Sequence, residues 1–188
     1  MMLPRDLFTV HSVRCGDGHV LLDFETDGYF CRYEGPAIEA VVPAAMPLEP
    51  YWREPSVEYP QVKPRTIGCF LLAYATALAR FPRQPVRALL IDALQLERIP
   101  RPNAPSPVQL AACFERLSLY LPIQPSCLLK AYALLHYLAD HGHGADWVIG
   151  VQLFPFRAHC WLAIDDVLLG ERAHLLEDYV PIYRLRCR

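Results

Sequence analysis

Two residues of the sequence have the type and the setting that nucleophilic catalysis needs, Cys127 and His159. Cys127 follows Pro125 and Ser126 directly and begins a strongly apolar stretch of helical composition. At a helix N-terminus, unpaired backbone N–H groups and the helix dipole favour a thiolate, which is the reactive form of cysteine. The same N–H groups can hold a developing oxyanion. A buried structural thiol is the alternative, and the position of Cys127 alone does not decide between the two.

His159 lies on a predicted strand over 158–164. Side chains alternate along a strand, so His159 and Trp161 share one face. Cys160 then points away from His159, and we expect its thiol to pack in the core. A histidine on a strand that follows a helix headed by cysteine is the arrangement of papain-like enzymes. There the histidine deprotonates the thiol and later protonates the leaving amine.

A third group is needed to orient the imidazole of His159, and the downstream candidates are Asp165, Asp166 and Glu171. If Asp165 and Asp166 form a two-residue turn, Glu171 lies opposite Cys160, on the wrong face. A one-residue bulge near the turn would move Glu171 onto the face of His159. Paired aspartates between apolar strands are also ordinary turn residues. The hairpin geometry by itself leaves the three acids open.

The elements that must position these residues are helices first and strands afterwards. Helical patterns cover 66–80, 85–98, 106–120 and 126–141, and strand patterns cover 147–153, 158–164, 167–169 and 179–185. Such an order predicts an α+β fold with an antiparallel sheet. The large domain extends over 66–188.

Two smaller parts precede this domain. Residues 1–35 predict a small N-terminal three-stranded β meander, with turns at Gly16-Asp17-Gly18 and Thr26-Asp27-Gly28. A sheet of this size is not stable alone, so it must pack on something. Residues 36–65 contain seven prolines, which exclude long helices and central strands and predict a linker or an extended strap.

The composition bears on which partners the protein can bind and on the cellular compartment we expect for it. A net charge of −2 over 188 residues, without a basic stripe, argues against nucleic-acid binding. No apolar run reaches membrane-spanning length and the start lacks a signal core, so we expect a cytoplasmic protein without a membrane span. Seven cysteines without a CxxC pair argue against a disulfide framework and a four-cysteine zinc site. His141 and His143 lie at a helix end, where we expect caps rather than metal ligands.

Two segments together resemble a known family. Residues 126–134 are similar to the catalytic-helix motif of lasso-peptide leader peptidases, and residues 148–151 with 156–162 are similar to their histidine strand. These are the B proteins of lasso-peptide biosynthesis, which have a transglutaminase-like (papain-like) core. The Cys-to-His interval also fits, and the resemblance covers about 106 to 183.

The resemblance implies a function and a third catalytic residue. Such enzymes cut the leader from a ribosomally made precursor peptide, beside an ATP-dependent macrolactam synthetase that closes the ring. The family places an acid shortly after the hairpin, which here is Glu171, where an aspartate is usual. Cys160 stands where alanine is usual, and we expect little consequence. No GxxxxGK[ST] loop is present, so we expect no cofactor, and any ATP requirement would belong to the synthetase.

The N-terminal meander resembles the opening strands of the leader-recognition domain called a RiPP recognition element. That domain usually continues with helices, whereas here the proline-rich stretch follows. The resemblance implies that the leader adds a strand to the third strand of the meander, over Tyr29, Phe30, Cys31, Arg32 and Tyr33. The alternative is that the meander only shields one side of the peptidase domain.

Two other functions remain open at this point. The same fold and triad serve acyl transfer to an amine, as in transglutaminases, and differ only in the nucleophile that resolves the acyl-enzyme. A non-catalytic leader-binding module with a decayed site is the third hypothesis. The intact Cys127 and His159 argue against decay.

Overall fold

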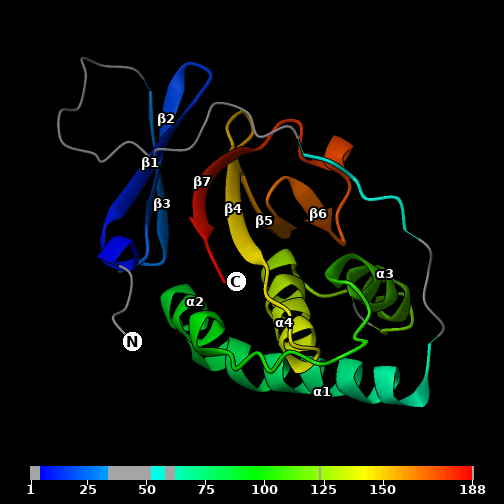
Figure 1. The fold of residues 1–188 in the computed structure, drawn as a ribbon. Helices are drawn as coiled ribbons and strands as arrows, with labels where there is room; N and C mark the ends of the chain where they lie inside the picture. Colours follow the sequence, from blue (N-terminus) through cyan, green and yellow to red (C-terminus); the bar gives the residue numbers. More distant parts are fainter. Residues whose placement is uncertain (1–4, 34–51, 58–61, 123, 188) are drawn as a thin grey trace.

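The computed structural model describes residues 5–33, 52–57, 62–122 and 124–187. This part of the chain forms four α-helices and two antiparallel sheets (Figure 1). The α+β class predicted from the sequence is therefore confirmed. Among these helices, none is both long enough and apolar enough to cross a membrane.

The small sheet is the predicted meander. It consists of β1 (Val10–Cys15), β2 (Gly18–Asp23) and β3 (Gly28–Tyr33), in the order β1-β2-β3. Cys15 pairs with Gly18, so Gly16 and Asp17 form a two-residue turn. Gly16 has a φ of +58°, which glycine adopts without a steric cost. A 3₁₀ helix, η1 (Arg5–Phe8), leads into β1.

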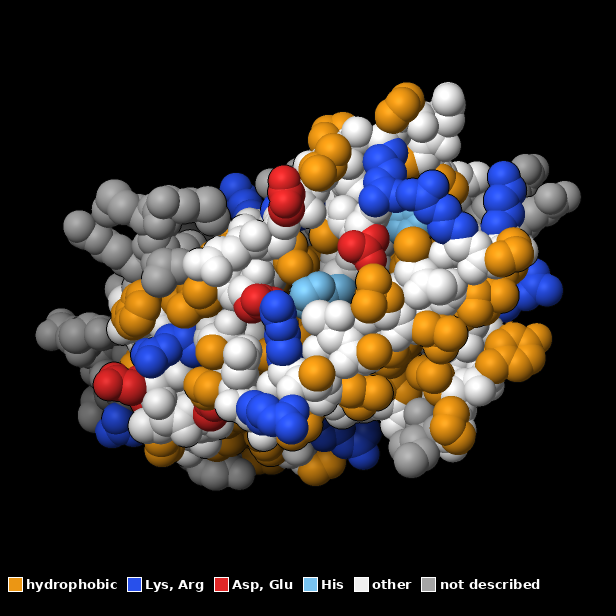
Figure 2. Space-filling view, turned by 90° about the horizontal axis from the view of Figure 1, so that it is seen from below, with side chains coloured by type: hydrophobic (Ala, Val, Ile, Leu, Met, Phe, Trp, Pro, Cys, Tyr) orange, Lys and Arg blue, Asp and Glu red, His pale blue; other side chains and the backbone are white. Residues whose placement is uncertain are grey.

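The helices lie close to their predicted bounds. They are α1 (Pro64–Arg80), α2 (Val86–Gln95), α3 (Pro107–Ser118) and α4 (Cys127–Asp140), with a 3₁₀ turn, η2 (Phe81–Arg83), after α1. Ser106 caps α3 in a capping box with Gln109, which fixes where that helix begins. Seen from the helical side (Figure 2), hydrophobic side chains lie between scattered charges. On α1 the exposed ones are Ile67, Leu71, Leu72 and Leu78.

The large sheet contains β4 (Asp146–Gln152), β5 (Arg157–Ile164), β6 (Val167–Leu169) and β7 (Val180–Leu185), with η3 (Ala173–Leu175) between the last two. Its order is β6-β5-β4-β7, and every neighbouring pair is antiparallel. The short β6 pairs only with residues 162–164 of β5. Within the described chain, the first half of β5 therefore has a free edge on that side. α4 lies against this sheet (Figure 1).

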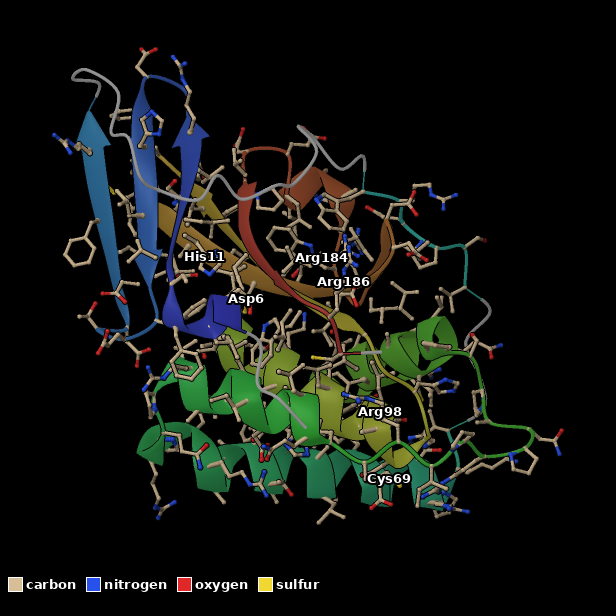
Figure 3. All side chains as sticks on the ribbon, turned by 60° about the vertical axis from the view of Figure 1, so that its left-hand side comes forward. Asp6, His11, Cys69, Arg98, Arg184 and Arg186 are labelled. Atoms are coloured by element: carbon tan, nitrogen blue, oxygen red, sulfur yellow. The ribbon has the colours of Figure 1, made fainter. Side chains whose placement is uncertain are left out.

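The meander packs against β7 and shares its core with the large domain. Val20, Leu22 and Phe24 are buried in the same apolar cluster as Tyr132 of α4 and Trp147 of β4. Figure 3 shows His11 and Asp6 at this junction. The imidazole of His11 lies 4.7 Å from the Tyr183 ring, centre to centre, and its Nε2 donates a hydrogen bond to the Asp6 carbonyl oxygen.

The opposite face of the large sheet has its own apolar cluster, built around Trp52 and Trp161, whose rings meet edge-to-face at 5.4 Å. Residues 52–57 lie beside β6 in an extended form, since Arg53 exchanges backbone hydrogen bonds with Asp166 and Leu168. This part of the predicted strap therefore covers the edge of the sheet. Residues 36–51 and 58–61 lie outside the described chain.

Candidate active site

Cys127 is the first residue of α4, as the sequence predicts. Ser126 is the N-cap, and its hydroxyl accepts a hydrogen bond from the N–H of Leu129. The Ser126 carbonyl accepts the N–H of Lys130, which begins the helical ladder. The N–H groups of Cys127 and Leu128 precede these two, and a helix has no backbone partner for N–H groups in its first turn. They are the donors that α4 can offer to an oxyanion formed at Cys127.

His159 is held on β5 by aromatic neighbours on its own face of the sheet. Its ring stacks on Trp161 at 6.0 Å and lies 5.5 Å from the Tyr179 ring. Gly150 pairs with His159 across β4 and β5. A Cβ on Gly150 would come within 2.5 Å of the Trp161 ring, so glycine is needed for that ring to lie there.

Glu171 is the acid that lies beside His159. Its Oε2 is 3.0 Å from Nε2 of the imidazole. With Nε2 occupied in this way, Nδ1 is the ring nitrogen that remains for Cys127. This is the arrangement that fixes the tautomer of a catalytic histidine and stabilises its protonated form.

The route by which Glu171 reaches His159 differs from the bulge considered from the sequence. The β5–β6 hairpin keeps an unbroken register around a two-residue turn at Asp165 and Asp166, which is the first of the two geometries considered from the sequence, without the bulge. Instead, β6 ends at Leu169, and Gly170 has a φ of +69°. The backbone leaves the β-ladder at Gly170, so Glu171 does not lie opposite Cys160 as it would if the hairpin register continued.

The two alternative acids lie at the turn and contact arginines. The Asp166 carboxylate accepts hydrogen bonds from Nε and Nη2 of Arg53 at 2.5 and 2.8 Å. The carbonyl of Asp165 accepts one from Nη2 of Arg184 at 2.6 Å. The structure therefore brings Glu171, and neither aspartate, to His159.

The electrostatics of the site favour an ion pair between Cys127 and His159. A hydrogen bond from the Cys160 thiol, then bonds from His159 and the Cys160 backbone, outweigh burial and lower the pKa of Cys127 to about 4. Burial disfavours the charged form of His159, but its bonds to Cys127 and Glu171 raise its pKa to about 9. Burial also opposes the ionised form of Glu171, yet His159 holds the Glu171 pKa below its ordinary value. Thiolate and imidazolium therefore coexist at neutral pH.

Cys160 has a role in the site that the sequence did not indicate. It is buried, as expected, but it lines the same small pocket as Cys127, and hydrogen bonding from its thiol and its backbone lowers the pKa of Cys127. Strand alternation separates Cys160 from His159 correctly. However, Cys127 lies beside the free edge of β5, where it can meet both residues. Burial raises the pKa of Cys160, which keeps this thiol protonated and able to donate.

A small pocket adjoins the two thiols, and Lys130, Trp161 and Glu171 are among its lining residues. Its volume is about 20 Å³. A space of this size holds about one water molecule. The pocket therefore offers room for a hydrolytic water beside the nucleophile.

The residues predicted to bind a leader lie on β3, which pairs only with β2 in the described part of the chain. Phe30, Cys31 and Arg32 are exposed, whereas Tyr29 is half-buried against the Phe156 ring at 5.4 Å. The side chain of Tyr33 lies outside the described residues.

Tyr29 also connects the meander electrostatically with the catalytic site. Burial, followed by electrostatic interaction with Cys160 and Cys127, raises the pKa of Tyr29 to about 12. Because the Tyr29 ring packs on Phe156, directly before β5, this end of β3 lies near the strand that carries His159.

The two histidines at the end of α4 bond to backbone carbonyls. His141 Nδ1 lies 2.8 Å from the Tyr137 carbonyl, and His143 Nε2 lies 2.9 Å from that of Pro105. Among the residues described, no group of three or more His, Cys, Asp or Glu side chains is placed to hold a metal ion.

A cysteine at the head of a buried helix, packed on an antiparallel sheet that presents a histidine, defines the class of papain-like, cysteine-dependent enzymes. Residues 69–184 match the family model of the transglutaminase-like superfamily, and the chain belongs to that superfamily. Its members are commonly cysteine-dependent peptidases or acyltransferases. Searches of curated proteins and of solved structures found no significant match.

Proposed function

We propose that this protein is a cysteine peptidase that removes the leader from a lasso-peptide precursor. The observation that carries the proposal is the Cys127–His159–Glu171 arrangement inside the two segments that resemble the leader-peptidase motifs. Membership of the transglutaminase-like superfamily supports the reaction class. The substrate class rests on the motif resemblance.

The mechanism starts from the ion pair. The Cys127 thiolate attacks the scissile carbonyl carbon, and the N–H groups at the start of α4 hold the oxyanion. As the C–N bond breaks, the His159 imidazolium gives its proton to the leaving amine. Neutral His159 then takes a proton from water, whose oxygen attacks the thioester. The tetrahedral adduct then collapses with cleavage of the C–S bond, which releases the carboxylic acid and restores the Cys127 thiolate beside the His159 imidazolium.

We place leader binding on the free edge of β3. An extended peptide can add a strand there through its backbone, with Phe30 and Arg32 available to its side chains. Tyr29, near the start of the same strand, packs on Phe156, directly before the strand that carries His159. A leader bound on β3 would thus deliver the following segment toward Cys127. The proposed partner is the ATP-dependent macrolactam synthetase, which would account for any ATP requirement.

The test is to mix the purified protein with a precursor encoded in a neighbouring reading frame, with and without the synthetase and ATP, and to read the masses. Loss of the leader is expected. Cys127→Ala should abolish cleavage while binding of a fluorescent leader, followed by anisotropy, persists. Cleavage that continues unchanged in Cys127→Ala would sink the assignment.

Acyl transfer is the second candidate, because the superfamily and the triad accommodate it equally. An added amine would then appear in the product mass, in place of a simple hydrolytic loss. A non-catalytic leader-binding module would bind the leader and leave all masses unchanged.

A further inference from the structure

We propose that Lys130 is a positioning residue of this site: by holding Glu115 and the Gly170 carbonyl it sets Glu171 against His159. The inference rests on the proposed catalytic roles of Cys127, His159 and Glu171. It adds a residue that the catalytic arrangement itself does not require.

Lys130 lies one helical turn after Cys127 on α4, so its side chain starts from the same end of the helix. Its Nζ is 3.0 Å from Oε1 of Glu115, on α3, and 3.2 Å from the carbonyl oxygen of Gly170. That carbonyl belongs to the peptide bond between Gly170 and Glu171. The hydrogen bond from Lys130 fixes the orientation of this peptide plane, and with it the direction in which the Glu171 side chain extends toward His159.

Glu115 supports the same point of the chain from the other side. A Cβ on Gly170 would lie 2.8 Å from Oε1 and 3.1 Å from Cγ of Glu115, so this side chain packs directly on the Gly170 backbone. Lys130 in turn holds Glu115. Residues of α3 and α4 therefore clamp the position where the backbone leaves β6 with a φ of +69°.

The charges explain why a cation is needed there. Glu115 and Glu171 both lie partly buried, and the charge of Glu171 makes Glu115 harder to ionise. Burial is the largest effect raising the pKa of Glu115, and Lys130 opposes it. Lys130 also helps His159 to overcome burial and lower the pKa of Glu171. Without the Lys130 ammonium group, the Glu171 carboxylate would lie near the Glu115 carboxylate with no cation between them. We therefore expect Glu171 to move away from His159.

When Lys130 is removed, a positioning role and a purely electrostatic role predict shifts of the His159 pKa in opposite directions. Removing a nearby positive charge, with nothing else changed, stabilises the imidazolium and moves the His159 pKa up. Releasing Glu171 from Nε2 removes the hydrogen bond and the negative charge that now hold that pKa at about 9, so it moves down. The direction of the shift therefore separates the two roles.

The experiment follows the rate of iodoacetamide alkylation at Cys127 against pH, read on the Cys127 peptide by mass spectrometry, and it needs no precursor. The wild type should show two inflections, one near pH 4 from the thiol and one near pH 9 from the imidazolium. In Lys130→Met the upper inflection should fall by about 1 to 3 pH units, as expected when an ionised partner is lost. Lys130→Arg, which keeps charge and donors, should restore it.

Two controls complete the design. Lys63→Met removes the only other lysine of the sequence, which is exposed at the start of α1, and should leave both inflections in place. Glu171→Gln should lower the upper inflection as Lys130→Met does. If Lys130→Met does not fold, the double variant Glu115→Leu/Lys130→Met replaces the ion pair by an apolar pair and is predicted to give the same fall.

An upper inflection that stays or rises in these Lys130 variants, while Glu171→Gln lowers it, overturns the positioning role and leaves the triad standing. A wild-type Cys127 that titrates only once, near the ordinary thiol pKa of about 8.5, overturns the triad itself, and the positioning role with it. A fall in Lys130→Met that Lys130→Arg restores supports the inference.

Discussion

At the scale of the residue, the ion pair of Cys127 and His159 predicts a broad pH range of activity. Below about pH 4 the thiolate takes up a proton and the nucleophile is lost. Above about pH 9 the imidazolium loses the proton that the leaving amine needs. We expect kcat/KM for leader cleavage to rise through the first pKa and to fall through the second. An acidic limb near the ordinary thiol pKa of about 8.5 would contradict the ion pair.

Cys160 allows a second prediction, because its thiol is the largest single cause of the low pKa of Cys127. Cys160→Ala should raise that pKa and move the acidic limb of the pH profile upward, with a stability cost of about 1 kcal/mol. The matched control is Cys113→Ala, which removes an equally buried thiol from α3. Alkylation of Cys127 against pH checks both variants. An acidic limb that stays in place in Cys160→Ala would show that its hydrogen bond is dispensable.

The residues of the site were predictable from the sequence to different degrees. Helix position and strand alternation indicate Cys127 and His159, because both are local properties of the chain. Glu171 could be selected only through the family resemblance. The hairpin register by itself puts it on the wrong face, and nothing in the sequence states that Gly170 leaves the ladder. Lys130 received no role, since its partners are distant in sequence.

At the scale of the element, Gly170 is the point where the end of β6 becomes part of the site. Gly170→Ala forces a left-handed φ on a residue with a Cβ, at about 1 to 2 kcal/mol, and presses that Cβ on Glu115. We expect lower stability and an upper alkylation inflection at Cys127 that falls with the His159 pKa. Thermal unfolding and the alkylation profile measure the two effects.

Gly16→Ala is the matched control for this substitution. Gly16 has a similar φ of +58°, and a Cβ there would meet nothing within 4 Å. It should therefore show a similar loss of stability with an unchanged alkylation profile. If both variants leave that profile unchanged, the backbone at Gly170 does not control Glu171.

The elements were largely predictable, since caps and turns mark their ends. Ser106 and Ser126 are the N-caps of α3 and α4, and both glycine-containing turns of the meander appear where the sequence puts them. The free edge of β5 follows from how short β6 is, and the sequence pattern already limits that strand to 167–169. The extended segment 52–57 beside β6 was expected only as an unspecified linker or strap. Proline excludes other structures there without indicating which surface the segment covers.

At the scale of the whole molecule, the question is whether the meander is a separate leader-binding domain or part of one folded body. Its inner face contributes Phe24, whose ring meets that of Tyr183 on β7 edge-to-face at 4.8 Å. Phe24 is 2% exposed and belongs to the main core cluster, whereas Phe30 on β3 is 55% exposed. The shared core favours a single cooperative unit that keeps one outer edge of β3 available.

The tryptophans make this testable, because none of the three lies in the meander. Trp147 and Trp161 belong to the large sheet, and Trp52 packs on Trp161, so tryptophan fluorescence reports on the large domain alone. Phe24→Ala should destabilise the protein by about 3 to 5 kcal/mol, and urea unfolding followed by tryptophan fluorescence should shift accordingly.

Phe30→Ala, on the same small sheet, should change stability by less than about 0.5 kcal/mol and serves as the control. If Phe24→Ala leaves the urea unfolding transition seen by tryptophan fluorescence unchanged, the meander unfolds on its own. A shift with Phe24→Ala alone means that one core links the sheet proposed to bind the leader to the helix that carries Cys127. Any leader bound on β3 would then stabilise the fold that carries the nucleophile, because a ligand of the native state stabilises the whole cooperative unit.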